Sequence, residues 1–71
     1  MFPKTANDIY RMAARNDLHN FELAKARQCV FIVTDTGVKQ VFGHYYTHSY
    51  AFWMDAIREA FANNNNTPNI T

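Results

Sequence analysis

"CVFIVTDTGVKQVFG" (residues 29–43) decides the fold class of this 71-residue chain. Residues 29–34 are β-branched and aromatic and are apolar at both parities, which is typical of a strand buried on both faces. Six residues is also a strand length rather than a helix length. Residues 35–37 carry a tight-turn signal that ends in glycine. Residues 38–46 alternate less cleanly, as an edge strand does, so the stretch predicts an antiparallel β-hairpin.

A helix is expected before the hairpin, over residues 5–16. Thr5 and Asp8 fit a capping box in which Asp takes the place of the usual Glu. Ile9 and Met12 then share one face of the helix, one turn apart. The spacing predicts that this apolar face is the buried one.

The helical pattern does not continue in phase beyond this point. On one continuous helix, Leu18 would lie among charged residues and well away from the apolar face. A break at Asn16 and Asp17 removes the conflict, because both residue types are favourable N-caps. The sequence therefore predicts a second helix over residues 18–27, with a single kinked helix over residues 5–28 as the alternative.

A last helix is expected at residues 50–62. Its apolar arc spans roughly 200°, which is wider than the stripe of about 100° that a surface helix needs. Trp53 lies within this arc and should be buried, whereas Phe52 lies at its margin. Residues 63–71 are polar and rich in Asn, and they predict a disordered tail.

The expected architecture is a small α+β domain over residues 1–62, in the order α-α-β-β-α. A two-stranded antiparallel hairpin is marginal by itself, so it should pack against the helices. A domain of this size buries only about 60% of the surface that its unfolded chain exposes. An aromatic content of 15% suits a chain with little core volume, and it also suits a protein that shares apolar surface with a partner.

Signals for catalysis and for metal binding are weak. His44 and His48 are four residues apart, but on an extended strand they would be roughly 13 Å apart and could not hold one ion. Cys29 begins the apolar strand and should behave as a small hydrophobic residue. The two glycines, Gly37 and Gly43, are too few for a glycine-rich phosphate loop. We therefore expect no enzymatic activity, no cofactor and no metal site.

Binding of another protein is the expected function. Tyr45, Tyr46 and Phe52 border the broad apolar arc of the last helix, and aromatic residues are enriched in interfaces. These three are the expected protein-binding residues of a regulator, adaptor or inhibitor, a class that mobile elements also encode. Self-association as a homodimer or larger homo-oligomer is a further expectation. The alternative is that these are scattered exposed aromatics, which are common.

Nucleic-acid binding is the alternative function. Its footprint would be basic and would lie on the two N-terminal helices, at Arg11, Arg15, Lys25 and Arg27. Acidic residues are interspersed among them and the net charge of the chain is only +1, whereas nucleic-acid-binding modules usually carry a clearer basic surface. Protein binding is therefore preferred.

A cytoplasmic protein that does not enter the membrane is expected. No run approaches the 18 apolar residues of a membrane span. Residues 1–10 contain no apolar segment of the signal-peptide type. The single cysteine cannot form an internal disulfide, which agrees with a reducing compartment.

Overall fold

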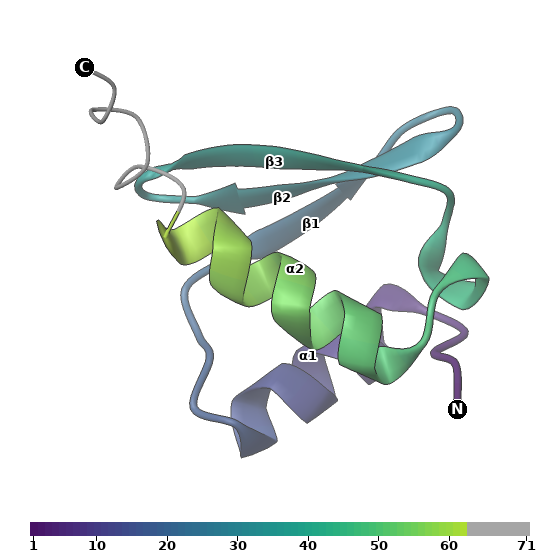
Figure 1. Ribbon diagram of the computed structural model, residues 1–71, viewed down its shortest axis with the longest axis horizontal. Coiled ribbons are helices and arrows are strands. Elements are labelled where there is room, and N and C mark those ends of the chain that lie inside the picture. The colour runs from purple at the N-terminus through teal and green to yellow at the C-terminus, as the bar shows by residue number, and fades with distance from the viewer. Residues whose placement is uncertain (63–71) are drawn as a thin grey trace.

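The computed structural model describes residues 1–62, so the tail predicted at residues 63–71 lies outside the described residues. The elements in chain order are α1 (Ala6–Arg15), β1 (Glu22–Lys25), β2 (Cys29–Thr34), β3 (Gly37–Phe42), the 3-10 helix η1 (Tyr45–Thr47) and α2 (Tyr50–Ala62) (Figure 1). The strands form one antiparallel sheet in the order β1-β2-β3. The small α+β class is confirmed, whereas the predicted two-stranded hairpin and α-α-β-β-α order are wrong in detail.

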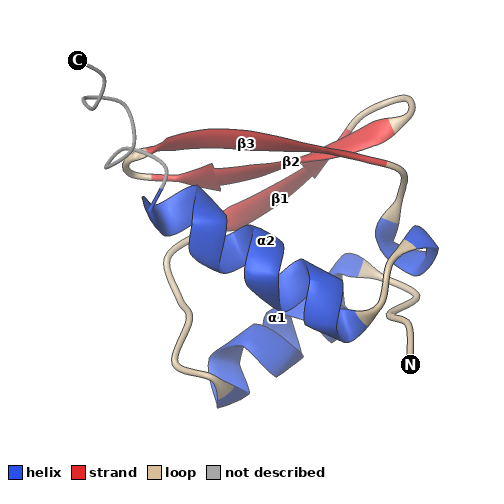
Figure 2. Ribbon diagram, viewed as in Figure 1, coloured by secondary structure: helices blue, strands red, loops and turns tan. Residues whose placement is uncertain are grey.

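Both α-helices lie on the same side of the sheet (Figure 2). α2 packs on β2 and β3 and also contacts α1. Trp53, Ile57, Ile9, Ile32 and Val30 are fully buried between these elements and form the centre of the core. The burial of Trp53 confirms the apolar arc that the sequence predicts for the last helix, and α2 has the predicted bounds.

The hairpin of β2 and β3 agrees with the predicted strand and turn. β2 spans the predicted residues, and Thr34 pairs with Gly37 at the turn. β3 is shorter than predicted, because it ends at Phe42 rather than at residue 46. Gly43 has φ +97°, and a Cβ added there would lie 3.0 Å from Cγ2 of Thr47. The chain therefore turns out of the sheet at this glycine and enters η1.

The break predicted after α1 exists, but it ends a helix and does not start another. The capping box is confirmed, because the Thr5 hydroxyl accepts from the Asp8 N–H and the Asp8 carboxylate accepts from the Thr5 N–H. At the other end Asp17 has φ +61°. The Leu18 N–H donates to the Ala13 carbonyl at 2.9 Å, as in a Schellman motif. This motif redirects the chain away from the helix axis.

The second helix predicted at residues 18–27 is wrong, and so is the kinked helix over residues 5–28. The segment instead contains β1, in which Ala24 lies opposite Phe31 of β2. Its start is fixed by Phe21, which is buried and packs on Tyr10 with a centroid distance of 5.3 Å. Pairing with the strongly β-forming β2 therefore overrides the weak helical propensity of this segment.

The two faces of β2 differ in burial. Val30 and Ile32 are fully buried on the face that meets the helices, called the inner face here. On the opposite, outer face Val33 is 36% exposed and Phe31 is only partly buried. The predicted burial of this strand on both faces is therefore wrong for the outer face, which no described element covers.

Candidate functional site

The predicted protein-binding residues lie between the end of β3 and the first turn of α2. Tyr45, Tyr46, His48 and Phe52 of this segment are called the aromatic connection below. Tyr46 is 64% exposed and Phe52 is 40% exposed, which makes them the accessible members. Because they are large aromatic side chains in contact with solvent, they meet the first requirement of a binding surface.

Tyr45 has a structural role in this segment. Its ring packs against Trp53 at a centroid distance of 6.2 Å, and its carbonyl accepts a hydrogen bond from the Trp53 Nε1–H at 3.0 Å. Burial raises the pKa of the Tyr45 hydroxyl, and the nearby Tyr10 hydroxyl adds to that shift. Tyr45 therefore joins the aromatic connection to the core, while Tyr46 and Phe52 point to the outside.

His48 holds Phe52 in place. The His48 ring stacks on the Phe52 ring with a centroid distance of 3.9 Å and an interplanar angle of 17°. His48 Nε2 lies 2.7 Å from the Phe42 carbonyl oxygen, so Nε2 carries the proton and donates. The Phe52 N–H donates to the Ser49 hydroxyl at 3.2 Å, which caps the start of α2. The Phe52 ring is therefore exposed and yet fixed in position.

His44 and His48, which are four residues apart in the sequence, donate hydrogen bonds to two different backbone carbonyls. His44 Nε2 donates to the Ala26 carbonyl at 3.2 Å and so ties the segment after β3 to the β1–β2 turn. His48 donates to Phe42 instead. Within residues 1–62 there is no group of three or more His, Cys, Asp or Glu residues that could hold a metal ion. The expected lack of a metal site and of catalysis stays a prediction.

Cys29 lies on the outer face of the sheet, opposite Phe42 of β3. It is only 7% exposed, because the side chain of Gln40 covers it and donates from Nε2 to the sulfur at 3.4 Å. The cysteine has no neighbouring base that would activate it within hydrogen-bonding distance in the described part of the chain. It therefore behaves as the small hydrophobic residue that its position in the sequence predicts.

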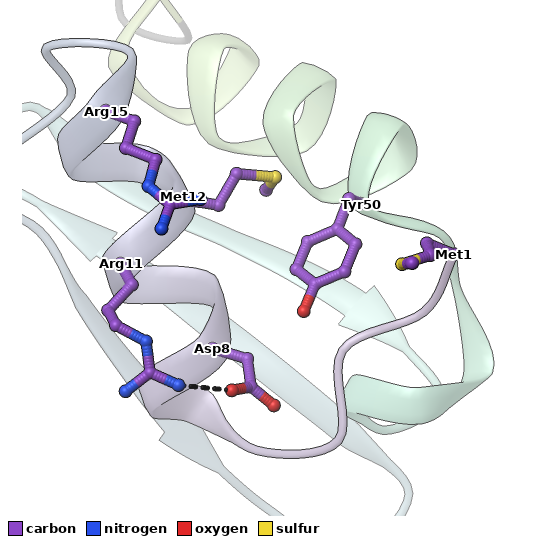
Figure 3. Close-up of a pocket in the computed structure, with 6 residues that line it drawn as sticks. All are labelled: Met1, Asp8, Arg11, Met12, Arg15 and Tyr50. Atoms are coloured by element: carbon purple, nitrogen blue, oxygen red, sulfur yellow. Dashed lines mark hydrogen bonds and ion pairs between the residues drawn. The ribbon is translucent and has the colours of Figure 1, made fainter.

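A cavity of about 380 Å³ lies between α1 and the start of α2 (Figure 3). It is lined by Met1, Asp8, Arg11, Met12, Arg15 and Tyr50. Arg11 donates to the Asp8 carboxylate at 2.7 Å, so part of the positive charge is neutralised within the cavity wall. The Lys4 N–H lowers the pKa of Asp8 most, and the Thr5 N–H and the Arg11 guanidinium add to the effect.

The four basic residues predicted to bind nucleic acid do not all lie on helices. Arg11 and Arg15 lie on α1 and line the same cavity. Lys25 lies on β1 and Arg27 in the β1–β2 turn, so their predicted position on a second helix is wrong. This turn lies at one end of the sheet and projects beyond the helices (Figure 1). The two pairs therefore lie on different elements, α1 and the β1–β2 hairpin.

The outer face of the sheet is a second apolar surface, which the sequence reasoning missed. It consists of Ala24, Phe31, Val33, Val38 and Phe42, together with Cys29 and Gln40. Val38 is 53% exposed and Phe42 is 71% exposed. The signal for it is present in the sequence, because β2 is apolar at both parities, and residues 1–62 provide helices for only one face of the sheet.

Comparisons of the chain with protein-family models, with curated proteins and with solved structures gave no match. Neither helix within residues 1–62 has the length and apolarity needed to cross a membrane. Within residues 1–62, the features that could bind a ligand or partner are the two apolar surfaces and the cavity beside α1.

Proposed function

We propose that this protein is a small, non-catalytic module that binds another protein through the aromatic connection. The observation that supports this most directly is the exposed Phe52 ring, stacked at 3.9 Å on a histidine that is itself hydrogen-bonded to the backbone. A ring held in this way loses little conformational freedom when a partner covers it, so more of its burial appears as affinity. Aromatic anchors of this kind dominate the energetics of many interfaces.

The surroundings of Phe52 also suit an interface. A shallow hollow beside the ring is lined by Lys39, Asp55, Ala56 and Glu59. Lys39 and Glu59 form an ion pair at 3.0 Å, and Asp55 is exposed. An apolar anchor bordered by charged side chains has the core-and-rim arrangement of protein–protein interfaces.

Affinity capture from native lysate tests this function. Wild type, Phe52→Ala and Tyr46→Ala serve as baits, with and without nuclease treatment. We expect a protein that wild type retains after nuclease treatment and that Phe52→Ala retains at least about fivefold less, since an aromatic anchor contributes more than about 1 kcal/mol.

Val38→Thr is the matched control, because it changes an exposed apolar side chain on the opposite, outer face of the sheet and keeps its β-branched shape. It should retain the partner at the wild-type level. Equal capture by wild type and by both aromatic variants would contradict the proposal.

Nucleic-acid binding is the second candidate, and the cavity beside α1 is the observation that favours it. Arg11 and Arg15 line this cavity together with the Tyr50 hydroxyl, which points towards the α1 side (Figure 3). Two cations can neutralise at most about two phosphates, so the affinity should fall only about tenfold between 50 and 200 mM salt. Binding of mixed-sequence DNA or RNA that is tighter than about 10 µM and weakened by Arg15→Ala would favour this candidate.

A further inference from the structure

On the outer face of the sheet, the apolar sequence and the observed exposure to solvent disagree most clearly. β2 has the composition of a strand buried on both faces, yet the described elements cover only its inner face. Val33 lies opposite Val38 at one end of this face, and Phe42 lies opposite Cys29 at the other end. An exposed surface of this composition in a protein of this size indicates a missing layer.

Each edge of the sheet has one outward backbone group covered by a side chain, and edge-to-edge pairing would leave the outer face of β2 exposed. The Leu23 N–H, which points outward from β1, donates to the Tyr10 hydroxyl at 2.7 Å. The Phe42 carbonyl, at the outer edge of β3, accepts from His48. Lys39 adds a charged side chain on this edge strand and pairs with Glu59. Charged side chains and covered backbone groups are the usual protection of sheet edges.

The two ends of the outer face carry opposite charges. Glu22 lies opposite Val33 at one end, next to the β2–β3 turn that contains Asp35. The β1–β2 turn at the other end contains Arg27. All three charged residues are exposed. The middle of the face is therefore apolar except for the exposed Gln40, and the face is acidic at one end and basic at the other.

We propose that the occupant of the outer face is a second copy of this chain, packed face to face about a two-fold axis perpendicular to the strands. This axis makes the strands of the two copies run in opposite directions. Each Arg27 then lies at the end of the interface that holds the partner's Asp35 and Glu22. A two-fold axis parallel to the strands would instead place like charges together. Because the contact is isologous, one self-complementary face is sufficient for both copies.

The size of the face makes this dimer transient. Two strands of six residues and one of four, about 4.8 Å apart and rising about 3.3 Å per residue, give a footprint of roughly 250 Å². Stable complexes bury about 800 Å² on each partner, so this contact belongs to the weak class. We expect a dissociation constant on the order of 100 µM.

Sedimentation equilibrium and NMR over about 10 µM to 1 mM protein test the dimer. Wild type should shift towards twice its monomer mass, and the concentration-dependent amide shifts should lie at Phe31, Val33 and Val38. The double variant Val33→Thr and Val38→Thr should remain monomeric, with a melting curve that shows it is folded. A monomeric wild type at about 1 mM, or shifts confined to Lys39 and Phe52, would overturn the proposal.

A charge exchange tests the orientation of the two copies. Arg27→Glu should weaken dimerisation at least about threefold, and Asp35→Arg should do the same, because each creates like-charge contacts. The double variant with both changes should recover the wild-type dissociation constant. If the double variant is weaker than either single variant, the proposed axis is wrong.

This inference and the proposed function can fail separately, because they concern different surfaces and partners. Phe52→Ala leaves the outer face unchanged and should dimerise like wild type. The Val33→Thr and Val38→Thr double variant leaves the aromatic connection unchanged and should still retain the captured partner. Loss of both activities in either variant would show that the two surfaces are not independent, which would overturn the face-to-face arrangement.

Discussion

At the scale of single residues, Phe52 and Trp53 are neighbours in the chain with opposite surroundings. Trp53 is fully buried, and its Nε1–H is satisfied by the Tyr45 carbonyl. Phe52 is 40% exposed and rests on His48. The position of each residue on the helix therefore decides whether its ring stabilises the monomer or remains accessible to a partner.

Truncation of these two rings should have different effects on stability. Trp53→Ala should lower the free energy of unfolding by about 3–5 kcal/mol, because it removes the centre of the core and leaves a cavity. Such a loss is enough to unfold a domain with only a few kcal/mol of stability. Phe52→Ala should cost only about 1 kcal/mol, since the ring is 40% exposed and loses its stack with His48 and an edge-to-face contact with Trp53. Urea unfolding followed by far-UV circular dichroism measures both, and equal losses would show that Phe52 belongs to the core.

Asp8 should make stability depend on acid pH. Its pKa in the folded protein is lowered from the ordinary value of 3.8, first by the Lys4 N–H and then by the Thr5 N–H and Arg11. A carboxyl with a lowered folded-state pKa contributes stability above its unfolded pKa and loses it as the pH falls through the folded pKa. Wild type should therefore exceed Asp8→Asn in stability at neutral pH, and the two should converge below about pH 4. A constant difference from about pH 2 to pH 7 in urea unfolding would exclude this role.

At the scale of elements, the end of α1 decides the topology. The Schellman motif at residues 13–18 turns the chain, and β1 then pairs with β2. Asp17 adopts φ +61° at the position where glycine is the usual residue. The backbone hydrogen bonds of the Schellman motif hold this conformation, although aspartate adopts a positive φ less readily than glycine does.

Asp17→Gly should stabilise the protein. Glycine adopts positive φ without the steric penalty of a Cβ, and the gain should be about 0.5–1 kcal/mol after the larger chain entropy of glycine is included. Thermal and urea unfolding of wild type and Asp17→Gly measure the difference. Asp17→Ala is the matched control and should be less stable than wild type, because alanine disfavours this conformation. A destabilised glycine variant would mean that the Asp17 side chain itself supports the turn.

At the scale of the whole molecule, one layer of helices covers one face of a three-stranded sheet. The described part of the chain therefore has a modest core, and the outer face of its sheet is exposed. Stability and association are therefore coupled, because whatever covers the outer face also stabilises the folded chain.

The melting temperature should consequently depend on protein concentration. With a dissociation constant near 100 µM, raising the concentration from about 10 µM to 1 mM should add about 1 kcal/mol and raise the melting temperature by several degrees. The Val33→Thr and Val38→Thr double variant should melt at one temperature throughout this range. Differential scanning calorimetry makes the comparison, and a wild-type melting temperature that does not change with concentration would count against the dimer.

Several elements could be predicted from the sequence because their signals are local. The capping box at Thr5 and Asp8 marks the start of a helix. The strand at residues 29–34 is a short β-branched apolar run that ends at a turn signal, and the helix at residues 50–62 has apolar residues at helical spacing. The exposure of Tyr46 and Phe52 also agrees with their position at the margin of the apolar arc. In these cases, residues that are close together in the sequence determine the secondary structure.

The tertiary structure alone decided β1, the separation of the basic residues and the two different faces of β2. Residues 22–25 have no strong secondary-structure propensity of their own, and they form a strand because they pair with β2. Lys25 and Arg27 thereby lie on the β1–β2 hairpin rather than on a second helix. The apolar pattern of β2 predicts burial of both faces of the strand, but it does not identify the elements that bury them. The burial depends on how many layers the rest of the chain packs against the sheet, and residues 1–62 pack one layer against it.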